Sequence, residues 1–413
     1  MEKTSNKRWV ILGVATLTLL FLGLIYAWSI FKGPLSEVFP MWTASQLSLT
    51  FTIAMSFFCI GGFVGGITNK IISVRTKFFI CAVMLFVAFF GVSFVDTSNP
   101  SRSLIILYVF YAFLGGSGVG LGYNAVIGNV TKWFPDCIGL ASGIMLMGFG
   151  LGALVLGGLA SSMMASKGVP TTFKILAVAI AIAMILSAIF IKAPAPGEVV
   201  APVAKDKEAI DKIAAVEAKQ YTSVEMLKTS SFWVFLVWNS IVGAAALLVI
   251  NSAANISVAY GGAAVLGMIV SLFNGFGRII NGTIFDKKGN IVSIFVITLF
   301  MLIAGALMSA GGLTNSYILI FIGLIFVGLS FGGCPTVASA YVNKMYGEKN
   351  FATNFSIMNF NLMISAMTGP TLSAKLLTAA GGSYNTNFYA VLAMAVLGMV
   401  LWVILVPILK KSK

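Results

Sequence analysis

Histidine is absent from this 413-residue sequence, and only 12 residues are Asp or Glu. Charged residues make up 9% of the chain, compared with roughly 25% in soluble globular domains. Hydrolytic and redox-metal sites usually need histidine or clustered carboxylates as ligands and bases, and this chain has few of either. We therefore expect a protein that is not an enzyme and that binds neither a metal nor a cofactor.

Cysteine is also scarce, and the four cysteines are scattered through apolar stretches: Cys59, Cys81, Cys137 and Cys334. Their spacings match neither a disulfide framework nor a zinc site. We interpret them as small packing residues.

Hydrophobic residues, in contrast, make up 59% of the chain. Twelve membrane helices of about 20 residues would use a similar share of this length. Long apolar runs separated by short polar segments predict twelve such spans. The predicted spans are residues 9–31, 45–68, 77–95, 103–128, 138–165, 171–191, 231–258, 261–285, 291–311, 315–341, 351–378 and 387–409. This pattern predicts an all-α membrane protein and excludes a water-soluble domain.

The longest polar interval, 192–229, divides the predicted spans six and six. We predict an N-terminal half at 1–192, a cytoplasmic linker at 193–229 and a C-terminal half at 230–413. Segment 205–219 alternates charges with apolar residues, which is typical of a short helix on the membrane surface, although a flexible linker explains it equally well. Two pseudo-symmetric six-helix halves suit alternating access, with a substrate site between them at the bilayer midplane.

The formal net charge of +14 is explained by membrane topology. If the N-terminus is cytoplasmic, 20 Lys and Arg residues lie on that side and 5 on the other. By the positive-inside rule, both termini are then cytoplasmic, in a cell inner (plasma) membrane. The basic excess therefore indicates orientation, and we expect membrane lipid but no nucleic acid as a partner.

One remaining cation, Arg278, lies inside a predicted span more than a turn from either end. Burying it costs about 2.5–3.5 kcal/mol on insertion scales, so water, a partner or a ligand should meet it. Asn274 and Asn281 are spaced to share its helical face. A structural alternative is that Arg278 extends to the cytoplasmic edge or pairs with a helix-end carbonyl. The polar face favours a substrate site.

The predicted spans contain no carboxylate that could neutralise Arg278, so the counter-ion is expected to be the ligand. The guanidinium group suits a carboxylate bound through two hydrogen bonds. One positive charge favours a small monocarboxylate over a dicarboxylate, unless Lys375 reaches inward. Other polar residues within spans could line the path, although interfacial Tyr and helix-bridging Asn are common. These residues are Tyr26, Tyr123, Asn124, Asn359 and Asn361.

Two glycine strings, at 115–124 and 148–158, lie inside apolar spans. A phosphate-binding loop would follow a strand, which these strings do not. Small residues at intervals of four allow helices to approach closely. We therefore interpret the strings as packing surfaces and exclude nucleotide binding.

Three stretches resemble the major facilitator superfamily, and within it the oxalate/formate antiporter and monocarboxylate transporter group. They are IYAWSIFKGPL (25–35), KWFPDCIGLASG (132–143) and SLFNGFGRIINGTIFDKKG (271–289), and the resemblance extends over essentially the whole chain. It implies that Arg278 is a substrate-binding arginine and that Asp286, Lys287 and Gly289 form the family's cytoplasmic loop motif.

The sequence departs from that family at informative positions. Leu362 stands where the oxalate exchanger has a second membrane lysine, so the pair that would bind a divalent anion is broken. Asn274 replaces an aspartate implicated in proton coupling in animal monocarboxylate transporters. Asn69 replaces the usual acid of the first loop motif, and Cys137 and Ile138 replace a basic pair.

From these observations we expect a monomeric secondary transporter of a lactate-like monocarboxylate, with protons as a second partner. In the absence of a titratable side chain in the cavity, a proton would move with the substrate or through water. An exchanger for oxalate and formate, or for another dicarboxylate, is the alternative within the same class. A membrane sensor that binds a carboxylate without moving it is the alternative from another class.

Overall fold

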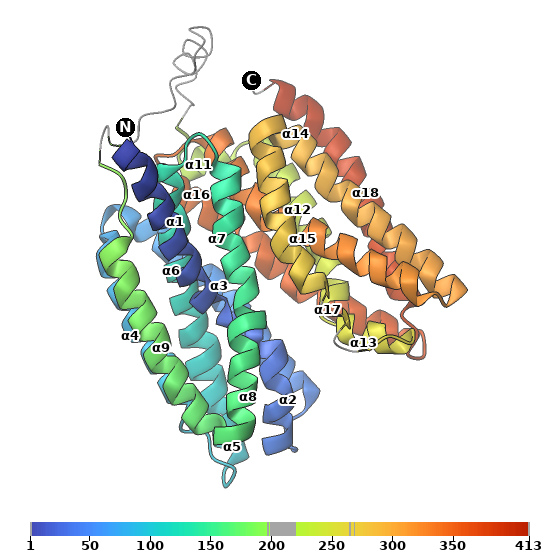
Figure 1. The fold of residues 1–413 in the computed structure, drawn as a ribbon. Helices are drawn as coiled ribbons and strands as arrows, with labels where there is room; N and C mark the ends of the chain where they lie inside the picture. The colour runs from blue at the N-terminus through green and yellow to red at the C-terminus, as the bar shows by residue number, and fades with distance from the viewer. Residues whose placement is uncertain (1, 196–197, 199–219, 264–265, 268, 412–413) are drawn as a thin grey trace. The chain divides into compact units, whose positions relative to one another are not determined.

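The computed structural model describes residues 2–195, 198, 220–263, 266–267 and 269–411, and nearly all of them are helical (Figure 1). In this described part, ten helices are long and apolar enough to cross a membrane. One of them, α14 (Ile269–Thr314), has 46 residues, which is about 69 Å of helix and twice the hydrocarbon thickness. It turns at Gly289, where φ is 79°, a value that favours glycine. The all-α membrane fold predicted from composition is thereby confirmed.

The ten candidate spans become twelve when α14 is counted as two helices that meet at Gly289, and when α16 (Phe351–Met358) and α17 (Phe360–Ala379) together are counted as one further span. These last two helices meet at Asn359, inside the eleventh predicted span. Proline does not cause this interruption, because Pro370 lies eleven residues further along, within α17.

The predicted seventh and eighth spans were wrong in their boundaries. The seventh run is divided into α12 (Ser230–Ile250) and α13 (Ala253–Ala259) by a turn at 251–252. The eighth helix begins at Ile269, eight residues later than predicted. Gly261, at φ 87°, lies between them in a conformation that side chains other than glycine's rarely adopt. The apolar composition of the sequence therefore continues past the helix ends, through the turn at 251–252 and through Gly261.

The chain divides into two compact units, each assembled from several stretches. Unit 1 comprises Met1–Asp136, Gly148–Lys219 and Asn350–Ile357, and unit 2 comprises Cys137–Met147, Gln220–Lys349 and Met358–Lys413. The predicted halves at 1–192 and 230–413 remain a proposal. The predicted surface helix at 205–219 lies outside the described residues.

The helices with their first residue in unit 1 are coloured mostly blue to green in Figure 1. They are α1 (Glu2–Leu22), η1 (Gly23–Ala27), α2 (Trp28–Val38), α3 (Ala44–Ile67), η2 (Thr68–Lys70), α4 (Val74–Val92), α5 (Pro100–Ile106), η3 (Leu107–Gly115), α6 (Gly116–Val130), η4 (Thr131–Trp133), η5 (Ala153–Gly157), α8 (Gly158–Lys167), α9 (Val169–Phe190) and α16. Those that begin in unit 2 are α7 (Ile138–Gly152), α11 (Ser223–Leu227), α12, α13, α14, α15 (Tyr317–Tyr346), α17 and α18 (Asn385–Lys411).

Several long helices begin where a hydroxyl side chain caps the first turn. Thr43 caps α3: its hydroxyl accepts a hydrogen bond from the Gln46 backbone amide, and the Gln46 side-chain oxygen accepts one from the Thr43 backbone amide. Ser73 begins α4 and Thr229 begins α12 in the same manner. These caps satisfy amides that have no partner within the helix. The Ser and Thr residues between the apolar runs therefore mark where these helices begin.

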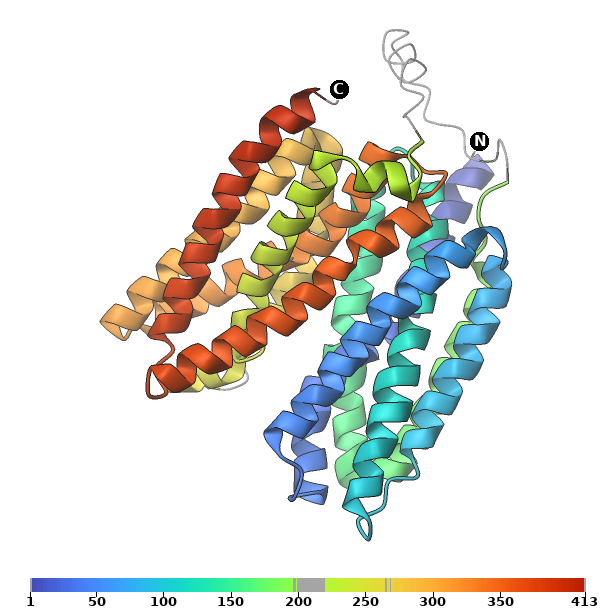
Figure 2. The same ribbon diagram turned by 180° about the vertical axis from the view of Figure 1, so that it is seen from behind.

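The glycine strings pack against neighbouring helices, as predicted. In unit 1, a Cβ on Gly116 would meet the carbonyl oxygen of Ala54, and a Cβ on Gly120 would meet that of Phe58. Both neighbours belong to α3, which packs along α6 (Figure 2). Side chains at these glycines would force the two helices apart, so glycine is required for the close approach.

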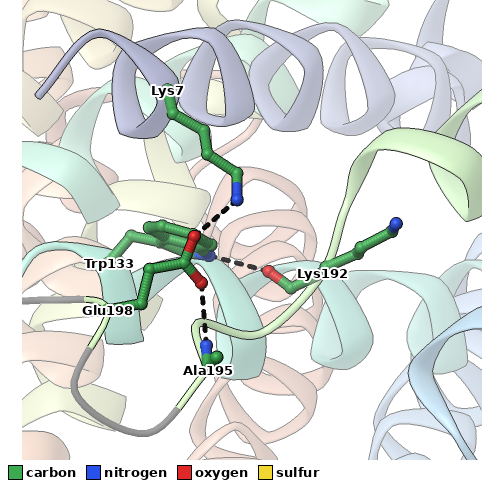
Figure 3. A network of polar contacts seen from close by, with 5 residues as sticks. All are labelled: Lys7, Trp133, Lys192, Ala195 and Glu198. Atoms are coloured by element: carbon green, nitrogen blue, oxygen red, sulfur yellow. Dashed lines mark hydrogen bonds and ion pairs between the residues drawn. The ribbon is translucent and has the colours of Figure 1, made fainter. Parts of the chain in front are cut away.

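A polar network in unit 1 ties the first helix to the segment that follows α9 (Figure 3). Lys7 donates to Glu198 over 2.5 Å, and the other carboxylate oxygen of Glu198 accepts from the Ala195 amide at 2.9 Å. The Trp133 indole donates to the Lys192 carbonyl oxygen at 2.7 Å. The hydrogen bond from Lys7, followed by that from Ala195, holds the pKa of Glu198 below its ordinary value.

We expect Glu198→Gln to lower thermal stability at neutral pH only slightly, because the ion pair is exposed. A lowered folded-state pKa means that the pair contributes fully above the ordinary glutamate pKa and is lost as pH falls through the folded-state pKa. Melting curves of both proteins in detergent, measured across acidic pH, should therefore converge at low pH. A difference that grows on acidification would contradict this account.

Candidate functional site

Arg278 lies in α14 with only 3% of its surface exposed, so the cation is buried as predicted. Its Nε donates to the side-chain oxygen of Asn274 at 3.3 Å, and its Nη1 donates to the backbone carbonyl of Leu146 in α7. Both of these acceptors are neutral. The buried side chain does not fit the alternative in which Arg278 extends to the cytoplasmic edge. A carbonyl contact, the other part of that alternative, is present, but the carbonyl belongs to a residue in the middle of a helix.

Glycines in unit 2 bring α7 and α14 together beside Arg278. A Cβ on Gly143 would lie 2.5 Å from the Arg278 carbonyl oxygen, and Gly139 and Gly282 would each clash with the other's carbonyl. The paired glycines allow backbone to touch backbone, which is how the Leu146 carbonyl comes within reach of the guanidinium. The arginine is positioned by helix packing as well as by its own helix.

The two asparagines predicted beside Arg278 have different surroundings. Asn274, one turn before the arginine, is half-buried and accepts its hydrogen bond. Asn281 is fully buried, and its amide donates to the carbonyl oxygens of Gly277 and Leu329. Leu329 belongs to α15, so Asn281 links α14 to its packing partner. The contact to Arg278 therefore comes from Asn274.

Two further candidate residues lie in the eleventh predicted span, which is interrupted at Asn359, and both belong to unit 2. Asn359 is 4% exposed at the junction of α16 and α17, and Asn361 is 2% exposed. The Leu362 amide donates to the Asn359 carbonyl, a shorter loop than an α-helix makes. Lys375 is exposed near the end of α17, and therefore does not reach inward.

The remaining candidates, Tyr26, Tyr123 and Asn124, belong to unit 1. Tyr26 and Tyr123 both contact the Phe149 ring, with centroids 5.2 and 5.0 Å away. Tyr123 also stacks on Phe355, at 6.1 Å. Asn124 is buried and donates to the Ala352 carbonyl at 2.9 Å. The two tyrosines thus join one aromatic cluster, whereas the Asn124 amide anchors a helix end.

Asp286 shows what the loop motif of Asp286, Lys287 and Gly289 does in unit 2. Its two carboxylate oxygens accept from the backbone amides of Gly139 and Leu140, at 2.8 and 2.7 Å. These amides open α7, so the carboxylate satisfies donors that have no partner in their own helix and complements the helix dipole. The aspartate therefore holds the helix that approaches Arg278.

Lys77 is a buried cation that the sequence reading missed, because it was counted with the loop before α4. The helix begins at Val74 and Lys77 is completely buried. Its ammonium donates to the Gly65 carbonyl at 2.5 Å and to the Asn69 side chain at 3.1 Å. Of the Lys and Arg side chains that the structure describes, only Lys77 and Arg278 are buried. The sequence did contain a signal for this burial, because apolar stretches flank Lys77 on both sides, at 60–67 and 78–92.

We expect Asn69→Asp to raise the melting temperature, because it would give the buried Lys77 ammonium a carboxylate in place of an amide oxygen. The present bond joins a charged donor to a neutral acceptor, and the carboxylate would add an opposite charge beside an ammonium that is completely buried. Thermal unfolding of the purified protein would measure the gain. The double variant Asn69→Asp with Lys77→Met should lose it, and a gain that persists there would show that the pair is not its source.

No cluster of three or more His, Cys, Asp or Glu side chains that could hold a metal ion occurs in the described part of the chain. None of the four cysteines forms a disulfide; three of them are buried and Cys137 is half-buried. They lie among packed helices, in keeping with their interpretation as packing residues.

A sequence model of the Major Facilitator Superfamily matches residues 8–360. The chain belongs to this superfamily, and it is a multi-pass membrane transporter by fold and family. The resemblance read from its motifs is confirmed.

Two curated relatives match most of the chain. The oxalate:formate antiporter of Oxalobacter formigenes is 28% identical over 297 residues, covering 71% of this chain and 66%, just under two thirds, of that protein. The uncharacterized MFS-type transporter YhjX of Escherichia coli (strain K12) is 28% identical over 308 residues, covering 73% of this chain and 71% of the relative.

Solved structures of the xylose transporter XylE share the fold. The proton:xylose symporter XylE bound to 6-bromo-6-deoxy-D-glucose has a TM-score of 0.70 at 17% identity, covering 96% of this chain and 95% of that one. Its partially occluded inward open form from E. coli has a TM-score of 0.66 at 16% identity, covering 96% and 97%. At this identity the likeness shows the fold alone.

Proposed function

We propose that this chain transports a small monocarboxylate, such as lactate, with Arg278 as the residue that binds the carboxylate. The observation that carries the proposal is a guanidinium 3% exposed whose contacts to Asn274 and Leu146 are made through neutral oxygens. A carboxylate bound through two hydrogen bonds would match the guanidinium in charge and shape.

The proposed preference for a single negative charge has two supports in unit 2. Lys375 is exposed, and the family resemblance places Leu362 where the oxalate exchanger has its second membrane lysine. A dicarboxylate bound at Arg278 would thus need its second charge compensated elsewhere, and desolvating an unpaired carboxylate costs several kcal/mol. Lys77 is engaged by Gly65 and Asn69 in unit 1.

The proposed energy source is the proton gradient. The predicted spans contain no histidine and no carboxylate, so the proton would move with the substrate or through water rather than on a side chain. Alternating access would then depend on the substrate binding to the two conformations of the carrier with different affinities.

Anion exchange is the second candidate, and the relative named oxalate:formate antiporter favours it. The chain shares with that group the arginine motif around Arg278, while Leu362 separates it from the exchanger's pair of cations. An exchanger would accept formate or oxalate and require an anion on the opposite side of the membrane.

Uptake into proteoliposomes separates these candidates from a sensor that transports nothing. Labelled lactate, formate and oxalate would be supplied with and without a pH gradient, and with and without unlabelled anion inside. We expect lactate uptake that a pH gradient accelerates in the absence of internal anion. Uptake only against internal oxalate or formate would establish exchange, and binding without uptake would establish a sensor.

A further inference from the structure

Four buried polar side chains belong to α12 and α17, two helices that pack side by side in unit 2 (Figure 2). Asn239 and Ser240 belong to α12, and Asn361 and Ser365 belong to α17. Each is at least nine-tenths buried. None of them is charged, and all four carry an oxygen that can accept a hydrogen bond or bind a cation.

The register of the two helices places these side chains within about one turn of one another. The Ser365 hydroxyl donates to the Ser240 carbonyl at 3.0 Å. One turn further along α17, a Cβ on Gly369 would lie 2.6 Å from the Ala244 carbonyl oxygen. A step of four residues on α17 thus matches a step of four on α12, so the helices run in parallel. Asn361, one turn before Ser365, therefore lies level with Leu236 and within about one turn of Asn239 and Ser240.

Three oxygens in this group are buried without a hydrogen-bond partner among the described residues: Oδ1 of Asn239, Oγ of Ser240 and Oδ1 of Asn361. Two of the donors in the group are directed elsewhere. The Asn239 amide donates to the Cys334 carbonyl at 3.4 Å, and the Ser365 hydroxyl to the Ser240 carbonyl. A buried acceptor left without a donor costs about 1–3 kcal/mol. The cluster thus presents lone pairs that something must satisfy.

The surroundings favour a small monovalent cation over a proton or a divalent ion. None of the four side chains takes up a proton near neutral pH. A divalent ion would need carboxylates, whereas Na⁺ in membrane transporters is held by neutral oxygens beside an interrupted helix. Here the interruption lies at Asn359, two residues before Asn361.

We propose that Asn239, Ser240, Asn361 and Ser365 form a Na⁺ site between α12 and α17. This site is separate from the carboxylate contact at Arg278, and the inference does not depend on the proposed function. Bound Na⁺ would join the two helices of unit 2 through oxygens that otherwise have no partner.

The test is thermal unfolding of the purified full-length protein in detergent, without any carboxylate. NaCl would replace choline chloride at constant ionic strength, and KCl would replace it in a parallel series. We expect a saturable rise in melting temperature of about 3 °C with Na⁺ and a much smaller one with K⁺. Equal responses to all three salts would overturn the proposal, leaving water as the occupant of the cluster.

Ser240→Ala is the informative variant, because its hydroxyl has no partner within the described structure. Removing it should leave the melting temperature in choline unchanged or raised, while the Na⁺ concentration for half the effect increases at least tenfold. Ser309→Ala is the matched control: Ser309 is another buried serine of unit 2 with an unpartnered hydroxyl, in α14. An equal loss of the Na⁺ response in both variants would refute the site.

Asn361→Asp adds a gain-of-function arm to the test. A carboxylate in place of the amide should lower the half-saturating Na⁺ concentration, since the ion would then meet a full negative charge. Binding of radioactive Na⁺ by equilibrium dialysis would report both directions without relying on stability. Unchanged binding in this variant would count against Asn361 as a ligand.

Discussion

Replacing Arg278 by lysine is expected to reduce carboxylate uptake roughly 10- to 100-fold while the protein remains folded. Lysine preserves the positive charge but not the planar fork, so one of two charge-assisted hydrogen bonds to a carboxylate would be lost, at about 1.5–3 kcal/mol. The shorter reach of a single ammonium would also abandon either Asn274 or the Leu146 carbonyl. Initial rates of labelled lactate uptake in proteoliposomes would measure the loss.

The matched control for this substitution is Arg75→Lys. Arg75 is exposed in the first turn of α4, with its guanidinium 6.0 Å from the Phe79 ring centroid. It should transport like the unaltered protein, because no buried contact depends on its fork. Similar uptake by Arg278→Lys and the unaltered protein, at equal amounts of folded protein, would remove Arg278 from the binding site.

A valine at Gly143 is expected to damage the protein even more, although this position has no side chain to lose. The added Cβ would lie 2.5 Å from the Arg278 carbonyl and 3.2 Å from the Ile279 Cα, both on the backbone of α14. A backbone contact cannot be relieved by a rotamer change, so α7 and α14 must separate. Overpacking usually costs about 1–3 kcal/mol, and a shift of two helices should reach the upper end of this range or exceed it.

We expect Gly143→Val to lower the melting temperature by several degrees and to abolish uptake, since Arg278 would lose the Leu146 carbonyl as a neighbour. Gly13→Ala in α1 is the comparison, because a Cβ there meets nothing within 4 Å. Alanine at an open helical position should leave stability unchanged or raise it by up to about 1 kcal/mol. If Gly143→Val unfolds and transports like Gly13→Ala, the close approach of α7 to Arg278 is not needed.

These two predictions address different contributions to one site. Lysine at 278 changes the chemistry of binding and leaves the helices in place, whereas valine at 143 displaces the helix that touches the guanidinium. Asp286 supports the second contribution, because it holds the first amides of α7. Damage from Gly143→Val without damage from Arg278→Lys would indicate that packing, rather than the cation, governs transport.

The sequence alone determined the membrane class, the superfamily and the exceptional cation. Hydrophobic runs must be helical in a bilayer, because backbone groups there need internal hydrogen bonds, and this makes composition a reliable guide. Arg278 was found by the same reasoning, since a charge inside such a run is costly, and its burial was confirmed. The helical spacing also placed Asn274 correctly, as a contact one turn away depends only on the helix itself.

Only the tertiary structure decided what faces each buried group. Asn281 has the correct spacing for the Arg278 face, yet it bonds to Leu329 of another helix. Lys77 looked like a loop residue, but neighbouring backbone and side-chain oxygens enclose it. The contact of Leu146 with Arg278 joins residues 132 positions apart. Helical periodicity describes one helix at a time, whereas these partners are set by how closely glycines let different helices approach.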